Sequence, residues 1–179
     1  MWKLIFWSVT VHAAFQFSPI VAERSVQFLT GNCTFNPKYF TNFTLTIVDN
    51  MMNMDMHLNR PIQRGFKANL DIQLRLANAK NFQSVFNQKN DVCAMIASMK
   101  NSLFNIWFKD MTKNSNFMYN CPVEVGHYYM HSWRMRSSLT HKFLIPGEYR
   151  GLINFFYGKY KTKSYEEALS LSIDSILSN

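Results

Sequence analysis

The segment FKANLDIQLRL, residues 66–76, constrains the fold more than any other part of the sequence. Apolar side chains occupy every second position, and polar or charged side chains stand between them. A side-chain period of two predicts a β-strand with one buried face and one face in water. Antiparallel sheets commonly have such a wet face, whereas buried parallel sheets are apolar throughout. The segment therefore indicates an antiparallel sheet.

Shorter segments alternate in the same way. Apolar residues take every second position in FTLTI, residues 43–47, and in MNMDMHL, residues 52–58. The turn-like sequence RPIQRG separates 52–58 from 66–76, so we expect these two segments to pair as a long hairpin. Alternation at 127–136 and 148–157 predicts further strands.

One segment follows a helical period. Between residues 91 and 112 the apolar residues recur three or four positions apart, and Asp91 is placed to cap the helix. Segment 164–177 fits either period, because its leucines and isoleucines suit a strand or a helix and its two glutamates favour a helix. Several strands with one helix predict a mainly β protein, an antiparallel β-sandwich with an inserted helix near 91–112.

The N-terminal segment has the features of a secretory signal peptide. Lys3 precedes an apolar run from Leu4 to Ala14, which is shorter than the roughly 20 residues of a bilayer-spanning helix. A small-x-small motif ending at Ala13 predicts that residues 1–13 are the signal peptide, with cleavage there or one residue later. No repeat or linker divides residues 14–179, so we expect a single domain.

Two N-glycosylation sequons agree with export. Asn32 and Asn42 each begin an N-x-S/T triplet, so both are expected to carry glycans and to face solvent. No later segment is long and apolar enough to cross a membrane. We therefore expect a secreted, extracellular protein without a transmembrane segment.

The three cysteines are Cys33, Cys93 and Cys121. In an oxidising compartment they are expected to form a disulfide framework. There is no C-x-x-C pair, and no histidine stands near a cysteine at zinc-site spacing. Because the count is odd, at least one thiol lacks an intrachain partner.

Charge and motifs argue against several functions. Removing Lys3 changes the net charge from +8 to 8 − 1 = +7, and the basic residues are scattered, so no nucleic-acid partner is expected. No phosphate loop or catalytic signature is present, so we expect neither enzymatic activity nor a cofactor. His127 and His131 stand four positions apart, which in a strand is ~13 Å, so no metal site is predicted.

Residues 91–133, with LIPGEY at 144–149, resemble the DUF1091 (DM8) family, an insect-expanded family of secreted proteins. The family signature has a cysteine opening a helix, a Ser-Asn stretch, Cys-Pro and, after a gap, Pro-Gly and an aromatic residue. The matching residues are Cys93, Cys121-Pro122 and Pro146-Gly147-Glu148-Tyr149. The segments CTFNPKYFTNFTLTI and MHLNRPI are also similar, so the resemblance covers most of the mature chain.

The DUF1091 family is similar to the CheA and CheB chemosensory proteins, and distantly to the GM2-activator and MD-2-related lipid-recognition proteins. This resemblance implies an immunoglobulin-like sandwich with a lipid cavity, and a strand at 164–177. It also implies a disulfide between Cys93 and Cys121, which would pin both ends of the helical excursion to one place. Cys33 then has no obvious partner.

The leading hypothesis is a secreted binding protein for a lipid or other hydrophobic small molecule, such as a chemosensory signal. Methionines cluster at 51–56, the chain has 16 Phe and 8 Tyr, and methionine lines adaptable apolar surfaces. The alternative is an extracellular interaction protein with a filled core, which binds a receptor through its surface. The predicted ligand contacts are Met52, Met54, Met56, Phe66, Leu70, Trp107, Trp133 and Phe155.

Overall fold

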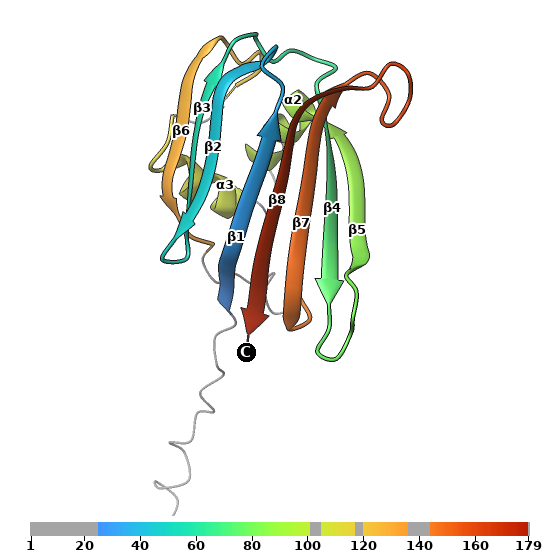
Figure 1. Ribbon diagram of the computed structural model, residues 1–179. Coiled ribbons are helices and arrows are strands. Elements are labelled where there is room, and N and C mark those ends of the chain that lie inside the picture. Colours follow the sequence, from blue (N-terminus) through green and yellow to red (C-terminus); the bar gives the residue numbers. More distant parts are fainter. Residues whose placement is uncertain (1–24, 101–104, 117–119, 136–143, 179) are drawn as a thin grey trace, which may run out of the picture.

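The computed structural model of the protein describes residues 25–100, 105–116, 120–135 and 144–178, and for residues 106 and 107 the backbone alone. The described chain is mainly β and forms two antiparallel sheets, which confirms the predicted β-sandwich (Figure 1). The predicted signal peptide, residues 1–13, lies outside the described residues.

The larger sheet, sheet A, has five strands in the order β1-β8-β7-β4-β5. They are β1 (Ser25–Phe35), β8 (Glu166–Ser178), β7 (Gly147–Tyr157), β4 (Lys67–Arg75) and β5 (Gln83–Asp91). The smaller sheet, sheet B, has three strands in the order β2-β3-β6. They are β2 (Phe40–Val48), β3 (Met51–Leu58) and β6 (Gly126–Trp133).

The predicted hairpin between 52–58 and 66–76 is wrong. β3 pairs with β2 and β6, whereas β4 pairs with β5 and β7, so the two segments belong to different sheets. The chain crosses between the sheets after β3, where the backbone of Ile62 exchanges hydrogen bonds of 2.8 and 2.9 Å with that of Val123. Alternation identifies a strand and its buried face, but it does not identify the neighbouring strand.

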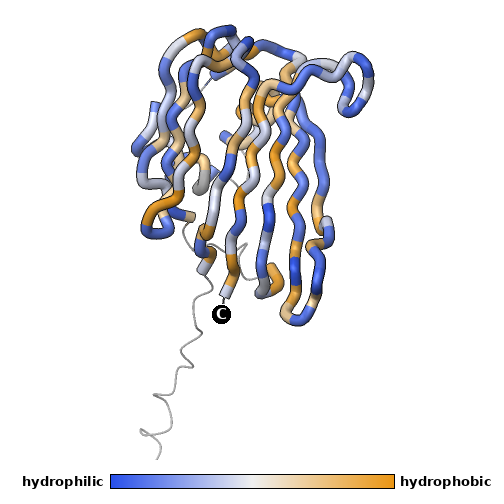
Figure 2. The backbone as a smooth tube through the Cα atoms, in the orientation of Figure 1, coloured by the Kyte–Doolittle hydropathy of each residue, from blue (hydrophilic) through white to orange (hydrophobic). Residues whose placement is uncertain are grey.

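Strand β5 was not predicted from the sequence. It is an edge strand with β4 as its neighbour, and most of its side chains are exposed. Figure 2 shows that β5 is largely hydrophilic, whereas the other strands of sheet A alternate in hydropathy. A strand with two wet faces has no alternating apolar pattern, so the sequence carried no strand signal here.

The predicted helical segment contains α2 (Val92–Lys100) and α3 (Asn105–Thr112). Asp91 caps α2 as predicted, because its Oδ1 accepts a hydrogen bond of 3.0 Å from the backbone N–H of Ala94. Its Oδ2 accepts another, of 2.8 Å, from the N–H of Gly65. Burial alone would raise the pKa of Asp91, but these backbone donors outweigh it and hold the pKa below its ordinary value. The ambiguous C-terminal segment is strand β8.

Strand β6 changes face near its end. Strict alternation along 127–136 predicts that Trp133 points to the same side as Tyr129 and His131, but in the structure Trp133 packs against the core. Ser132 has a positive φ of 54°, and the register with β3 shifts between Met52 and Met54. The extra residue turns Trp133 inward, where it packs against the core.

Candidate functional site

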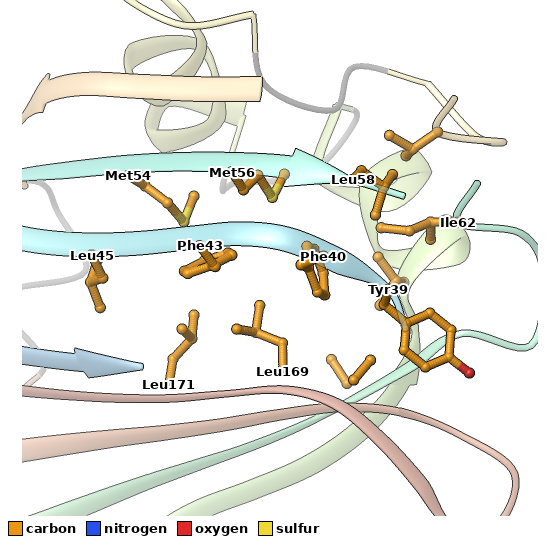
Figure 3. Packing of buried hydrophobic residues seen from close by; sticks show 14 of the residues in the cluster. Tyr39, Phe40, Phe43, Leu45, Met54, Met56, Leu58, Ile62, Leu169 and Leu171 are labelled. Carbon is orange, nitrogen blue, oxygen red and sulfur yellow. The ribbon is translucent and has the colours of Figure 1, made fainter. Parts of the chain in front are cut away.

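The inward side chains of sheet B form a tightly buried surface. Met52, Met54 and Met56 are 5%, 8% and 1% exposed, and Phe43 of β2 is 3% exposed. Figure 3 shows Met54, Met56 and Phe43 on the side of sheet B that faces Leu171 of β8. We call the surface formed by Phe43, Met52, Met54 and Met56 the closed face. The predicted ligand contacts on β3 therefore lie in packed core.

The inward side chains in the middle of β4 and β7 are less covered than those toward the ends of β4, where Leu74 is 7% exposed. Leu70 lies opposite Ile153 in the register of these strands, and Ile72 lies opposite Gly151. All four positions have intermediate exposure, although they share the inward face with Ala68, which is 4% exposed. We call the surface formed by Leu70, Ile72, Gly151 and Ile153 the open face. A three-stranded sheet is too narrow to cover a five-stranded one.

Two inward-facing glycines of sheet A show how differently the side chains of sheet B pack on its two parts. Gly31 of β1 and Gly151 of β7 both pair with Ile173 of β8, so they lie in one row across the sheet. A Cβ added at Gly31 would lie 3.1 Å from Leu45 Cδ2 and 3.2 Å from Ile47 Cδ1. At Gly151, the carbonyl oxygen of Ile173, at 3.9 Å, is the described contact. Sheet B thus packs directly on β1, while no such close side-chain contact is described at Gly151.

Aromatic rings close one end of the sandwich. Phe66 is 2% exposed, and its ring stacks on that of Phe155 at 5.9 Å and tilts against Tyr157 at 5.0 Å. Tyr157 in turn stacks on Tyr39 at 5.5 Å. The fold therefore brings together two predicted ligand contacts: Phe66, which directly precedes β4, and Phe155 of β7. Both lie next to the open face.

Trp133 lies toward the other end of the sandwich. Its ring centroid is 5.6 Å from that of Phe28 in β1. Its indole Nε1 is buried and has no hydrogen-bond partner among the described residues. A buried donor left unpaired costs about 1–3 kcal/mol. Trp133 therefore presents a polar N–H inside an apolar region, where an acceptor oxygen of a ligand could pair with it.

The helical segment connects the two edge strands. α2 follows directly on β5, and α3 contacts β6. In Figure 1, α2 lies behind the upper part of sheet A, and α3 lies next to β2 of sheet B. The disulfide between Cys93 and Cys121 holds the start of α2 to the segment before β6, with the two Cα atoms 5.4 Å apart, as predicted. Trp107 lies in α3, but its side chain is outside the described residues.

The outer surface of sheet A contains a polar cavity of about 600 Å³. Asn69 is 3% exposed there, and its Oδ1 has no hydrogen-bond partner within the part of the chain that the structure describes. Asp71 accepts a hydrogen bond from the Ser84 hydroxyl, which is the largest influence lowering the pKa of Asp71. Because amide, hydroxyl and charged groups line this cavity, it suits a polar ligand rather than a hydrocarbon chain. Other lining residues are Asn87, Lys89, Asn154 and Tyr160.

The outer surface of sheet B carries a group that the sequence analysis missed. Asp55 and His57 are two positions apart on β3, and His57 lies opposite His127 of β6. His127 Nε2 is 2.8 Å from Asp55 Oδ2, and the two imidazole rings stack at 4.5 Å with an interplanar angle of 18°. The sequence signal is Asp-x-His in an alternating strand, but the second histidine is distant in the chain.

The structure also shows where the predicted glycosylation sites and the cysteine outside the disulfide lie. Asn32 and Asn42 are both exposed, as predicted, on β1 and β2; whether they carry glycans stays a prediction. Cys33 is a half-buried free thiol, and its Sγ lies 3.6 Å from the carbonyl oxygen of Phe43. The Cys33 thiol therefore lies beside the closed face and is only partly exposed to solvent.

These features define an antiparallel β-sandwich with a helical segment pinned by a disulfide. No described helix has the length and apolarity of a membrane-spanning helix. Residues 68–151 match the family described as "Protein of unknown function (DUF1091)", which confirms the family predicted from the sequence. The matched region runs from β4 through the disulfide-linked segment into β7. No curated protein matches the chain.

Proposed function

We propose that this chain is a secreted binding protein that holds a lipid or other hydrophobic small molecule against its open face. One observation supports this function above others: the inward side chains of Leu70, Ile72 and Ile153 keep partial exposure, in contrast to the closed face. Ligand sites are concave and mostly apolar, with few polar groups. The open face has the apolar part of that description.

Three neighbouring features fit such a ligand. The Phe66 and Phe155 rings would bound its apolar end, and the unpaired Nε1 of Trp133 would donate a hydrogen bond to an oxygen of its polar end. The helical segment, held by the Cys93–Cys121 disulfide, would cover the ligand from the side of the edge strands. The protein would act by binding and not by catalysis.

The test is uptake of a fluorescent fatty-acid probe by the protein secreted from eukaryotic cells. Native mass spectrometry of the same sample would detect any lipid that copurifies with it. In the variant Ile153→Trp, an indole occupies the space above the open face, so probe binding should fall. The matched control is Leu152→Trp, one position along β7, where the side chain points to the outer surface. This control should bind the probe as the unmodified protein does.

Circular dichroism should show both variants folded. The proposal fails if the unmodified protein binds no apolar probe and contains no copurified lipid. It also fails if Ile153→Trp and Leu152→Trp weaken binding equally, because the open face would then not be the site. Secretion is tested separately by the intact mass, which should begin near Ala14 and decrease after glycosidase treatment.

A second candidate function is an extracellular interaction protein. It is favoured by exposed apolar side chains at one end of sheet A, on and beside the edge strand β5. Val85 and Phe86 are 56% and 45% exposed, and Leu76 and Ile145 are 48% and 57% exposed. If this function holds, Phe86→Glu should abolish binding to the surface of receptor-bearing cells, while Ile153→Trp should leave it intact. The opposite pattern would favour the ligand carrier.

A further inference from the structure

The outward side of β3 and β6 presents three metal-ligating side chains on a regular sheet surface. Asp55 and His57 share a face because side chains two positions apart in a strand point the same way. His57 and His127 face each other across the antiparallel pair, where Cβ atoms stand about 4.5–5.5 Å apart. The backbone thus brings together two imidazoles and one carboxylate from distant parts of the sequence.

The distances are close to those of a metal site. One ligand atom from each of Asp55, His57 and His127 lies within 4.8 Å of the others. Zn–N and Zn–O bonds are about 2 Å long, so ligand atoms around one tetrahedral zinc ion stand about 3.3 Å apart. Because the lone pairs of the two stacked imidazoles lie in nearly parallel planes, binding an ion requires these rings to rotate until the lone pairs converge. The side chains of His127 and Asp55 are 45% and 35% exposed, so an ion can reach them from solvent.

The strand that carries His127 is held in place from its outer edge. Asn116 donates from Nδ2 to the carbonyl oxygen of His127 at 2.8 Å, and its Oδ1 accepts from the N–H of Tyr129 at 2.7 Å. The backbone of Ser115 also bridges to Met130. These contacts fix the backbone on which one ligand stands, and rigid elements hold metal ligands more accurately than loops do.

An ordinary surface ion pair is the simpler explanation of the Asp55–His127 contact. Such exposed pairs contribute little to stability, and a pair needs only two groups. The stacked ring of His57 places a third ligand beside them. Three ligands from a strand pair, two of them imidazoles, match the donor sets of three-ligand zinc sites.

We propose that Asp55, His57 and His127 bind one zinc-type divalent transition-metal ion, with a coordination position left for water or for a side chain of another protein. Two nitrogen donors favour zinc or copper over calcium and magnesium, which take oxygen ligands. The site lies on the opposite side of β3 from the closed face, so it is separate from the proposed ligand site. A bound ion would link β3 to β6.

The test is a zinc titration of the full secreted protein after treatment with a chelator, in competition with a chromophoric zinc indicator. We expect one high-affinity ion per chain. His57→Ala and His127→Ala should each weaken binding by at least about tenfold, since even partners that only orient a ligand contribute 10–100-fold. His131→Ala is the matched control, because His131 is exposed on the same strand and its ring contacts that of Tyr129 in a tilted arrangement, outside the group. It should bind zinc normally.

Two further measurements separate a ligand role from a folding effect. Zinc should raise the melting temperature of the unmodified protein and of His131→Ala, but not of His57→Ala. Cobalt in the zinc site should give visible absorption bands that His57→Ala and Asp55→Asn lose. The proposal is overturned if the unmodified protein binds no zinc, or if His131→Ala loses as much affinity as His57→Ala.

Discussion

The closed face and the open face come from the same kind of sequence but have different surroundings. Phe43, Met52, Met54 and Met56 on the closed face are all below 9% exposed. On the open face, Leu70 and Ile153 remain partly exposed although they also point inward. Both sets are apolar residues at alternating positions. What differs is the element that stands opposite each of them.

The difference follows from the number of strands. Sheet B, with three strands, packs over the β1 and β8 side of sheet A, and β7 and β4 extend beyond that packing. A Cβ added at Gly31 would lie 3.1 Å from the Leu45 side chain of β2, and one added at Gly151 has no comparable described contact. The closed face therefore stabilises the fold, and the open face is the part of the interior to which we assign the ligand in the proposed function. The experiments below separate these two roles.

The largest expected effect is on the closed face. Replacing the 1%-exposed Met56 by alanine removes buried atoms and leaves a cavity, so Met56→Ala should lower the free energy of unfolding by about 2–5 kcal/mol. Leu70→Ala on the open face should lower it by only about 1 kcal/mol, because the side chain is already partly exposed. Urea denaturation measures both. Equal losses would mean that the open face is packed core.

The disulfide should have the next largest effect. Cys93 and Cys121 are 28 positions apart, and closing a loop of this length contributes about 3 kcal/mol in the chain-entropy model. The double variant Cys93→Ser with Cys121→Ser should lose about that much free energy of unfolding, measured by urea denaturation. It should also take up less apolar probe, since the helical segment is no longer held at one end. Cys33→Ser is the control and should retain probe binding.

Local periodicity predicted β2, β3, β4, β6, β7 and the helical segment, whereas β1 was not predicted and β8 was assigned only through the family resemblance. The sequence predicted the wrong partner for β4, because pairing depends on how the chain crosses at Ile62 between the sheets. It missed β5, whose side chains are wet on both faces. It misplaced Trp133, because one residue at Ser132 with positive φ shifts the alternation. Pairing and bulges are decided by tertiary contacts.

The candidate sites were harder to predict than the strands. Alternation shows that Met54 and Leu70 both face inward, but it does not show that sheet B covers the first and leaves the second partly exposed. The Cys93–Cys121 pair came from family resemblance. The group of Asp55, His57 and His127 depends on the register of β3 with β6, and that register cannot be read from either segment alone.

A smaller effect concerns the start of the helical segment. Asp91→Ala removes the cap of α2 and the acceptor of the Gly65 N–H, so it should destabilise the protein by about 1 kcal/mol at pH 7. The pKa of Asp91 is lowered in the folded chain. The stabilisation by the Asp91 carboxylate is therefore fully present above about pH 4, the pKa of Asp in the unfolded chain. It is lost as the pH falls through the lower pKa of the folded chain. The difference from the unmodified protein should shrink in urea denaturation at acid pH.

The smallest effect gives the sharpest comparison, because it places the same methyl group on two inward-facing positions of one row. Replacing glycine by alanine stabilises a compatible site by about 0.4–1 kcal/mol, because the unfolded chain loses freedom. At Gly151 no described side chain lies within 4 Å of the new Cβ, so Gly151→Ala should be neutral or stabilising by about 0.5 kcal/mol. At Gly31 the new Cβ would lie 3.1 Å from Leu45, and the crowding should make Gly31→Ala destabilising by about 0.5 kcal/mol. Thermal melts of both variants should shift in opposite directions, and the larger Gly151→Val should also reduce uptake of the apolar probe. If both alanine variants shift the same way by the same amount, β1 and β7 are covered equally, and the distinction between a closed and an open face has to be given up.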